Sequence, residues 1–446
     1  MPHVTETLDA IIILAAGQGK RMNSDTPKML HTIAGASMLK HVAHATKHIP
    51  CTQRLCVVPP EPMGSIIHED VPSMTKIIQK TPQGTGNATL CAANAIREER
   101  SDTLILCGDT PLLTTEILDD LITTRRQKNL TATIAAVDVV PPCDYGRIIR
   151  DKKGRIIAII EAKNASKEHY AQTRCYVGML AIQTKLLRPL LQKIPKNPVS
   201  GEYDLTHIIR LMADQEMPLD DVLMPHTHVL GVNTPEARQK AEDIMQQRLR
   251  ERAIKAKASL LMPHSLYFSY DTQLAENVRV EPFVFFAPNV TIRAHSHIRA
   301  HSHIEGAHIG QRTTIGPYAR IRPHSSIGDE SRIGNFVEIK NATIGHKTRI
   351  NHLSYIGDAT IGRNVNIGAG VITCNYDGTK KHHTTINDHA FVGSNCALVA
   401  PLTIGEKATI AAGSTITRNV SAQALAISRP PHREIPHWSQ RRLAKT

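Results

Sequence analysis

The sequence lacks the features that indicate a disulfide-bonded, zinc-binding or membrane-spanning protein. Its eight cysteines are scattered over 446 residues without a CxxC pair, which predicts mostly buried thiols. The longest apolar run near the start, 11–16, is far shorter than the roughly 20 residues of a transmembrane helix. Glu6 and Asp9 precede that run, which does not fit a signal peptide. These absences predict a cytoplasmic protein.

Aromatic residues are also scarce, and this limits what the strong positive charge can mean. Aromatics make up 4% of the chain, and no RNA-binding aromatic motif accompanies the net charge of +13. A basic surface attracts phosphate in any molecule, so small phosphorylated substrates explain the charge equally well. We therefore expect phosphorylated metabolites as ligands, and neither nucleic acid nor a membrane as a partner.

The first half of the chain has the pattern of an α/β domain. Short β-branched runs alternate with helix-like segments; the runs include 11–14, 55–58, 103–106 and 133–139, and the helix-like segments include 38–48 and 87–98. This alternation is typical of a largely parallel sheet covered by helices. We expect this domain to occupy residues 1–235 and a polar segment over 236–256 to form a connecting helix.

The second half, 257–446, changes to a six-residue period. Apolar residues recur every six positions with occasional five-residue steps: Leu274, Val280, Phe286, Ile292, Ile298, Ile304, Ile309, Ile315, Ile321, Ile327, Ile333, Ile339, Ile344, Ile350, Ile356, Ile361, Ile367, Ile386, Val392, Leu398, Ile404, Ile410 and Ile416. This repeat indicates a parallel β-helix, in which three repeats make one triangular coil and the apolar residue points inward.

Two further expectations follow from this repeat. Glycine often follows the apolar residue, as in Gly310, Gly316 and Gly345, and we expect it to permit the backbone conformation of a tight corner. Equivalent positions should meet about 18 residues apart, so Thr313 is expected one coil beyond His295. The four histidines at 295, 297, 301 and 303 would then lie on different faces rather than form a metal site.

A glycine-containing turn follows the first predicted strand. Residues 14–22 read LAAGQGKRM, and PKML follows at 27–30. Small residues let backbone N–H groups approach a phosphate, whose charge Arg21 and Lys28 can complement. A plain strand-to-helix corner would contain the same glycines, but the added arginine and Pro-Lys favour phosphate binding. The turn is not a Walker loop, because no Gly-Lys-Ser/Thr is present.

LAAGQGKRM with PKML resembles the signature of sugar-1-phosphate nucleotidylyltransferases. With the β-helix, the chain from about residue 9 to 430 resembles the bacterial bifunctional N-acetylglucosamine-1-phosphate uridylyltransferase/glucosamine-1-phosphate acetyltransferase family. The resemblance implies a Rossmann-like α/β nucleotidyltransferase followed by a left-handed parallel β-helix. It implies synthesis of UDP-N-acetylglucosamine for peptidoglycan and lipopolysaccharide, from glucosamine 1-phosphate, acetyl-CoA and UTP. It also implies Mg²⁺ and a homotrimer whose acetyl-CoA groove is shared between neighbouring β-helices.

The resemblance implies a nucleotide and sugar site in the first half. The matching positions are Leu14, Ala15, Ala16, Gly17, Arg21, Lys28, Gln79, Gly84, Thr85, Cys107, Gly108, Asp109, Gly146, Glu161 and Asn233. Asp109 and Asn233 match the ligands of Mg²⁺, which prefers hard oxygen ligands. Without this context, a helix cap would be the plainer interpretation of Asp109.

Three positions depart from the family pattern. Tyr176 stands where a sugar-binding amide is expected, and Asp204 and His207 stand where tyrosine and aspartate are common. If Tyr176 points into the pocket, it should crowd the sugar and weaken uridylyl transfer.

The resemblance implies a second site in the β-helix. His352 matches the catalytic base, a role that suits the near-neutral titration of an imidazole. The sugar-phosphate positions are Arg322, Lys340, Tyr355 and Asn366, and the acetyl-CoA positions are Ala369, Asn375, Tyr376, Ser394, Ala412 and Arg429. Asn375 and Tyr376 belong to a loop over 373–383 that interrupts the repeat. A surface histidine is the plain alternative for His352 taken alone.

Two other functions remain open at this point. The first is a nucleotidylyltransferase with a single activity and a regulatory β-helix, and the second is a non-catalytic scaffold that only binds nucleotide sugars. The loop and His352 argue for an acetyltransferase, and assays of both half-reactions would separate the three hypotheses.

Overall fold

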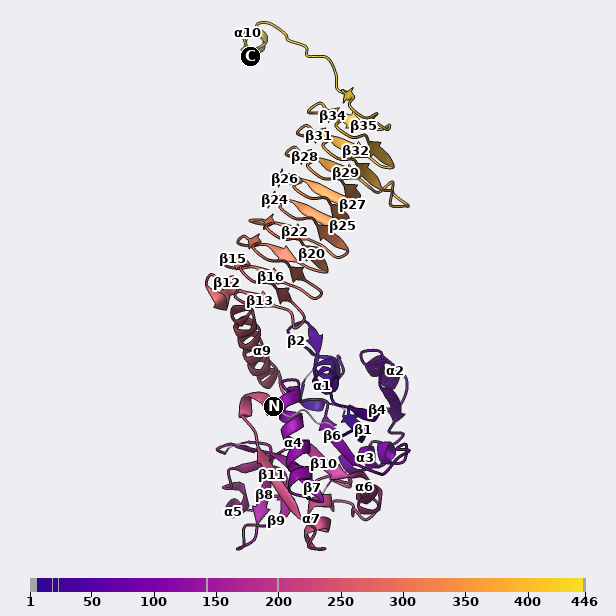
Figure 1. Ribbon diagram of the computed structural model, residues 1–446, viewed down its shortest axis with the longest axis vertical. Helices are drawn as coiled ribbons and strands as arrows, with labels where there is room; N and C mark the ends of the chain where they lie inside the picture. Colours follow the sequence, from indigo (N-terminus) through magenta and orange to yellow (C-terminus); the bar gives the residue numbers. More distant parts are fainter. Residues whose placement is uncertain (1–5, 18, 23, 142, 199, 444–446) are drawn as a thin grey trace. The chain divides into compact units, whose positions relative to one another are not determined.

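The structure is a computed structural model that describes residues 6–443 except 18, 23, 142 and 199. The chain divides into two units, Met1–Met245 and Gln246–Thr446 (Figure 1). The boundary between them falls inside helix α9 (Pro235–Lys255), in the segment predicted to form a connecting helix. Among the described residues, no helix is both long and apolar enough to cross a membrane.

The first unit is built on one sheet with the strand order β11-β7-β10-β6-β1-β4-β5. Its strands are β1 (Leu8–Leu14), β4 (Cys51–Val58), β5 (Thr75–Ile78), β6 (Asp102–Cys107), β7 (Ala132–Asp138), β8 (Gly146–Arg150), β9 (Ile156–Ile160), β10 (Arg174–Gln183) and β11 (Leu219–Leu223), with a separate hairpin of β2 (Thr32–Ile33) and β3 (Ala36–Ser37). β1 pairs in parallel with β4 and β6, whereas β10 is antiparallel to β6 and β7. The largely parallel sheet is confirmed, and β10 interrupts it.

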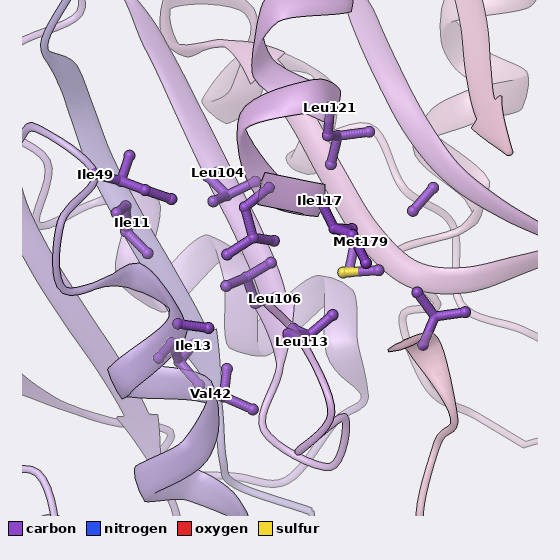
Figure 2. Close-up of a cluster of buried hydrophobic side chains, with 14 of the residues drawn as sticks. Ile11, Ile13, Val42, Ile49, Leu104, Leu106, Leu113, Ile117, Leu121 and Met179 are labelled. Atoms are coloured by element: carbon purple, nitrogen blue, oxygen red, sulfur yellow. The ribbon is translucent and has the colours of Figure 1, made fainter. Parts of the chain in front are cut away.

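Helices cover both faces of this sheet. They are α1 (Met38–Thr46), α2 (Met63–His68), α3 (Thr85–Ala93), α4 (Thr115–Gln127), α5 (Lys167–Tyr170), α6 (Thr184–Leu191), α7 (His207–Ala213) and α8 (His226–Val229). Successive residues of a strand point to opposite faces, so Ile11 and Ile13 join one apolar cluster and Ile12 joins the other. Figure 2 shows the first cluster, in which Ile13 lies near Val42 of α1.

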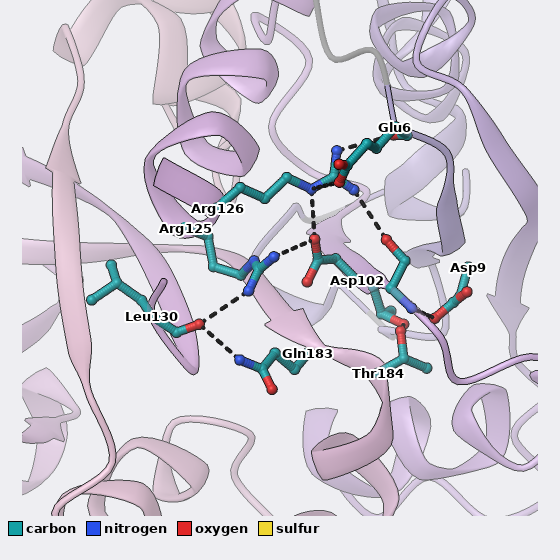
Figure 3. Close-up of polar contacts among 10 residues, drawn as sticks. Glu6, Asp9, Asp102, Arg125, Arg126, Leu130, Gln183 and Thr184 are labelled. Atoms are coloured by element: carbon teal, nitrogen blue, oxygen red, sulfur yellow. Dashed lines mark hydrogen bonds and ion pairs between the residues drawn. The ribbon is translucent and has the colours of Figure 1, made fainter. Parts of the chain in front are cut away.

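A buried ion pair joins α4 to the start of β6. Asp102 is 1% exposed, and its Oδ2 accepts hydrogen bonds from Arg125 Nη2 and Arg126 Nε, both at 2.8 Å (Figure 3). A buried carboxylate needs such partners, because removing an unpaired charge from water is costly. The ion pair occupies the amino end of β6 and leaves its carboxyl end, at Cys107, for the site described below.

The second unit is a left-handed parallel β-helix with three faces. The first face contains β12 (Ser259–Leu260), β15 (Arg279–Val280), β18 (His297–Ile298), β21 (Thr314–Ile315), β24 (Arg332–Asn335), β26 (Arg349–His352), β28 (Asn366–Ile367), β31 (Phe391–Val392), β34 (Thr409–Ile410) and β36 (Leu425–Ala426). The second contains β13 (Tyr267–Phe268), β16 (Phe285–Phe286), β19 (His303–Ile304), β22 (Arg320–Ile321), β25 (Glu338–Ile344), β27 (Tyr355–Ile361), β29 (Ile372–Cys374), β32 (Ala397–Val399) and β35 (Thr415–Ile416). The third contains β14 (Gln273–Leu274), β17 (Thr291–Ile292), β20 (Ala307–Ile309), β23 (Ser325–Ile327), the ends of β25 and β27, β30 (Thr384–Ile386) and β33 (Leu402–Ile404).

The inward apolar column is confirmed, and the expected reason for the glycines holds at Gly316, with φ of 88°, but is wrong for Gly310 and Gly345. Ile333, Ile350 and Ile367 are at most 3% exposed and stack on neighbouring coils. The left-handed corners are formed mainly by other residues, such as His295 and Tyr318, with φ of 61° and 54°. The glycine that follows an isoleucine usually has no positive φ and instead gives clearance between coils. A Cβ on Gly345 would lie 2.4 Å from the carbonyl carbon of Gly362.

The coil length also differs from the expected 18 residues at several places, of which the coil after His295 is one. Strand β18 pairs His297 with Thr314, a step of 17 residues, because the repeat contains a five-residue step before Ile309. Arg312, and not Thr313, therefore lies one coil beyond His295. His301 stacks between Phe283 and Tyr318, and His297 contacts Glu281, so these histidines have separate surroundings.

Gly345→Ala should destabilise the β-helix by about 1–3 kcal/mol, because the new methyl group must push two tightly stacked coils apart. The free energy would be followed in the far-ultraviolet circular dichroism transition of the second unit. Ser326→Ala, at an exposed position of β23, is the matched control and should change stability by less than about 0.5 kcal/mol. Equal stability of the two variants would contradict the clearance argument.

Candidate functional sites

A pocket of about 620 Å³ opens at the carboxyl ends of β1 and β6. These ends coincide because the parallel register pairs Leu14 with Cys107. The predicted site residues that line the pocket are Leu14, Ala16, Gly17, Lys28, Gln79, Gly84, Thr85, Cys107 and Asp109. The predicted residues outside this lining are Ala15, Arg21, Gly108, Gly146, Glu161 and Asn233. Ala15 is fully buried in the sheet, and the Gly108 N–H donates to the Leu14 carbonyl at 3.0 Å.

The Lys28 ammonium donates hydrogen bonds to both predicted metal ligands, Asp109 and Asn233. Lys28 Nζ donates to Asp109 Oδ2 at 2.6 Å and to Asn233 Oδ1 at 2.7 Å. The two oxygens therefore converge on one cationic group, although 124 residues separate them in the chain (233 − 109). A carboxylate and an amide oxygen are hard donors of the kind that Mg²⁺ binds, so this pair of residues fits the metal.

Arg21 extends this polar cluster towards the surface. Its Nη1 donates to Asp144 Oδ2 at 2.7 Å, and its Nη2 donates to Asn233 Oδ1 at 3.2 Å. Asn233 thus accepts from both predicted phosphate-binding cations. Asp144 is an acidic partner that the sequence motifs did not single out, because it lies far from the glycine-containing turn in the sequence.

The loop between β5 and α3 forms the other side of the pocket. Gln79 is 3% exposed, and its Nε2 donates to Gly84 O at 3.1 Å, so these two predicted nucleotide-site residues support one another. Gly84 has φ of 91°, and a Cβ there would lie 2.7 Å from the Tyr203 carbonyl oxygen. The Thr85 hydroxyl accepts from the Leu205 N–H at 3.0 Å. Only glycine at 84 permits this close pairing of the loop with 202–206.

Glu161 and Gly146 lie together on the β8–β9 hairpin. A Cβ on Gly146 would lie 3.8 Å from Glu161 Cδ, and Thr206 Oγ1 donates to Glu161 Oε1 at 3.0 Å. Burial raises the pKa of the Glu161 carboxyl, and the bond from Thr206 opposes that change. These two predicted nucleotide- and sugar-site positions are therefore adjacent in space.

The structure separates the three residues that depart from the family pattern. Asp204 lines the pocket and accepts from Asn197 Nδ2 at 2.7 Å. Tyr176 is only 8% exposed, belongs to an apolar cluster with Ile148 and Leu180, and does not line the pocket. Its phenol interacts with Cys107 and Glu161, so the expectation that its ring crowds the sugar stays a prediction. His207 begins α7, and burial lowers the pKa of its imidazole.

His352 lies at one edge of the first face of the β-helix. Backbone hydrogen bonds connect successive coils along this edge, from Gly370 N to His352 O, from Asn395 N to Ala369 O and from Gly413 N to Ser394 O. The predicted base and the predicted acetyl-CoA positions Ala369, Ser394 and Ala412 therefore form one column. Arg429 joins its end, because its Nη1 donates to Ala412 O at 2.6 Å.

The predicted phosphate residues meet on the second face. The sheet register places Lys340 beside Gly357, and a Cβ on Gly357 would lie 2.5 Å from the Tyr355 hydroxyl. Arg322 Nη1 donates to Glu338 Oε1 at 2.8 Å. Strand register thus brings Arg322, Lys340 and Tyr355 to one surface.

Lys381 of the loop is a site residue that the sequence motifs missed. Its ammonium lies beside Lys340 and lowers the pKa of that side chain, with further effects of burial and of Arg322. Two neighbouring ammonium groups can attract an anion, since a phosphate would relieve their repulsion. The basic residues 380 and 381 were visible in the loop, but only the fold shows which of them reaches Lys340.

The loop itself is held by acidic residues. Asn375 is 8% exposed and donates its amide to Asp358, so its side chain supports the base of the loop. Asp377 accepts from the Thr379 and Lys380 N–H groups and contacts His382 Nε2 at 2.7 Å, and these bonds lower the pKa of its carboxyl. Tyr376 is 61% exposed beside this turn, and its hydroxyl donates to Gly378 O at 2.6 Å.

Asn366 lies apart from the other predicted sugar contacts. It starts β28 on the first face, where it pairs with Arg349 and Phe391. Arg322, Lys340 and Tyr355 belong to the second face. One chain therefore presents the predicted sugar-phosphate residues on two faces.

The pocket at the sheet edge and the column that begins at His352 on a hexapeptide β-helix together define a nucleotidyltransferase joined to an acyltransferase. Residues 11–197 match a family described as the MobA-like NTP transferase domain. Residues 303–377 match the GMPPB C-terminal domain, and 383–418 match the hexapeptide repeat of succinyl-transferase. A crystal structure of UDP-glucose pyrophosphorylase complexed with UDP-glucose covers 54% of this chain at 13% identity with a TM-score of 0.43, which is too low to bear on the fold.

Curated relatives match almost the whole chain. The bifunctional protein GlmU of Paramagnetospirillum magneticum is 36% identical, covering 97% of this chain and 96% of the relative. Those of Zymomonas mobilis and Bartonella quintana are 40% and 39% identical, covering 96% and 94% of this chain and 96% and 93% of the relatives.

The chain therefore belongs to the bifunctional GlmU family. It is a glucosamine-1-phosphate acetyltransferase and an N-acetylglucosamine-1-phosphate uridylyltransferase, as the resemblance predicted. Membership favours this bifunctional enzyme over the single-activity and scaffold hypotheses.

The burial of Tyr176 leads to a stability prediction. Tyr176→Asn should destabilise the first unit by about 2–4 kcal/mol, because it replaces a packed ring with an amide in apolar surroundings. Urea unfolding followed by circular dichroism measures the change. Tyr176→Phe, which keeps the ring, should cost less than about 1.5 kcal/mol. If Tyr176→Asn instead leaves stability unchanged and lowers the KM for the sugar phosphate, crowding is the correct interpretation.

Proposed function

We propose that the first unit binds UTP and N-acetylglucosamine 1-phosphate in the pocket at the ends of β1 and β6, with Mg²⁺ held by Asp109 and Asn233. The convergence of both oxygens on Lys28 Nζ carries this proposal. When bound, the metal neutralises phosphate charge and orients the reacting groups. The predicted residues that line the pocket would contact the nucleotide, and Gly146 and Glu161, which lie together on the β8–β9 hairpin, would contact the sugar.

Uridylyl transfer requires positioning and charge neutralisation rather than a covalent intermediate. A phosphate oxygen of the sugar attacks the α-phosphorus of UTP, one P–O bond forms, and the bond to pyrophosphate breaks with its electron pair on the leaving oxygen. Lys28 and Arg21 point their charges at the developing phosphate charge from the same side as Asn233. Their present acceptors would be exchanged for phosphate oxygens.

For acetyl transfer, we assign His352 as the base. The amine of glucosamine 1-phosphate attacks the thioester carbonyl carbon, a C–N bond forms, and the C–S bond breaks with its electron pair on sulfur. The imidazole accepts the proton that the nitrogen loses, and this proton neutralises the CoA thiolate. Arg322, Lys340 and Lys381 supply three positive charges for the sugar phosphate.

Acetyl-CoA would lie along the column that contains His352, Ala369, Ser394 and Ala412. This column follows the axis of the β-helix at about 4.8 Å per coil, so an extended pantetheine arm can run along it. Arg429 at its end suits the phosphates of CoA. The small side chains along the column leave room for the arm.

We also propose a homotrimer. The separation of Asn366 from Arg322, Lys340 and Tyr355 on two faces supports it, because a sugar phosphate can touch both sets only if two β-helices face each other. A trimer of three-sided β-helices gives each chain two such neighbours.

His352→Ala should lower acetyl transfer by about 10²-fold or more, measured as thiol release from acetyl-CoA with glucosamine 1-phosphate. Pyrophosphate release by the first unit should stay unchanged and serves as the internal control. His346→Ala, a change of the same type on the neighbouring corner, should retain both activities. Full acetyl transfer in His352→Ala would reject His352 as the base.

Asp109→Asn should lower uridylyl transfer by about 10²-fold at millimolar Mg²⁺, since the charged metal ligand is lost. Part of the activity should return as Mg²⁺ is raised, and acetyl transfer should not change. Asp120→Asn, at an exposed position of α4, is the matched control. An unaltered Mg²⁺ dependence in Asp109→Asn would contradict the metal assignment.

A further inference from the structure

The side chain of Asn335 contacts the proposed base. Strands β24 and β26 are neighbours on the first face, and their register places Asn335 directly beside His352. Asn335 Oδ1 lies 2.8 Å from His352 Nδ1, a full hydrogen bond. None of the residues assigned above to the substrates makes this contact.

This contact determines which ring nitrogen carries the proton. The amide oxygen of asparagine only accepts, so His352 Nδ1 must donate a proton to it. In the neutral ring the other nitrogen, Nε2, then has a free electron pair. A ring with the opposite tautomer would present an N–H where a base is needed, and it would leave two acceptors facing each other.

Among the strands that surround His352, Asn335 is the residue placed to orient the imidazole. The strands beside His352 bring one charged side chain, Arg332 of β24, and β26 itself brings Arg349, whereas β28 brings none. These three strands therefore contain no carboxylate that could orient the imidazole. The backbone of the β-helix keeps Asn335 and His352 on consecutive coils, so the contact needs no induced fit.

We propose that Asn335 is a positioning residue for acetyl transfer, which holds His352 in the Nδ1–H tautomer and so presents Nε2 to the sugar amine. This inference rests on the proposed role of His352. Asn335 acts through the imidazole and makes no contact with the substrates.

The experiment compares Asn335→Ala and Asn335→Asp in the full chain. Asn335→Ala should lower the kcat of acetyl transfer by at least about 10-fold while the KM for glucosamine 1-phosphate stays within about twofold. Asn335→Asp keeps an acceptor and should retain most of kcat. Its acidic limb in the pH–rate profile should move to higher pH, because a carboxylate stabilises the protonated imidazole. Asn387→Ala, an exposed asparagine of the same β-helix, should leave kcat and the pH profile unchanged.

Several outcomes would overturn the proposal. An unchanged kcat in Asn335→Ala, or a rise in KM alone, excludes a positioning role. Collapse of kcat in Asn335→Asp would mean that the amide nitrogen, and not the oxygen, faces His352. Uridylyl transfer by the same variants should stay unchanged and is the internal control.

A double variant separates this inference from the assignment of the base. If Asn335 acts through His352, then Asn335→Ala should have no further effect in a His352→Ala background. Additive losses would place Asn335 in contact with a substrate. If His352→Ala alone retained full activity, the base assignment would fail, whatever the result for Asn335.

Discussion

Parallel strand register decides where the functional side chains of both units lie. In the first unit, the pairing of Leu14 with Cys107 brings the ends of β1 and β6 to one edge of the sheet. In the second, the pairing of Asn335 with His352 places an amide oxygen on an imidazole nitrogen. A shift of one residue would turn each of these side chains to the other side of its strand. The buried isoleucine column resists such a shift, because it would expose an apolar residue in every coil.

Charge is distributed in the same way in both sites. Cations are concentrated where phosphate is expected, and they are held by oxygen acceptors: Lys28 donates to Asp109 and Asn233, and Arg322 donates to Glu338. The positive charge of Lys381 repels that of Lys340 and so lowers the pKa of the Lys340 ammonium. A bound phosphate dianion would reverse that change and favour the charged amine. The net charge of +13 fits the two anionic sites proposed above.

The loop over 373–383 connects these arguments. It interrupts the β-helix, yet Asp358 and Asp377 hold it firmly at its base and at its turn. This support keeps Lys381 near Lys340, whose pKa it lowers, and leaves Tyr376 exposed beside the turn. A solenoid has few surfaces of its own for enclosing a ligand, and an inserted loop supplies one.

The sequence by itself determined the architecture and the family, because a six-residue period has few physical solutions and LAAGQGKRM with PKML is a specific motif. It did not determine why the glycines are there, since clearance between coils at Gly345 depends on a residue 17 positions away in the next coil. It placed Thr313 instead of Arg312 beside His295, because a single five-residue step changes the register of a whole coil. The burial of Tyr176, the contact of Lys381 with Lys340 and the bond from His352 to Asn335 were decided only by the tertiary structure. Each depends on segments that are distant or unpatterned in the sequence, and only packing sets their separation.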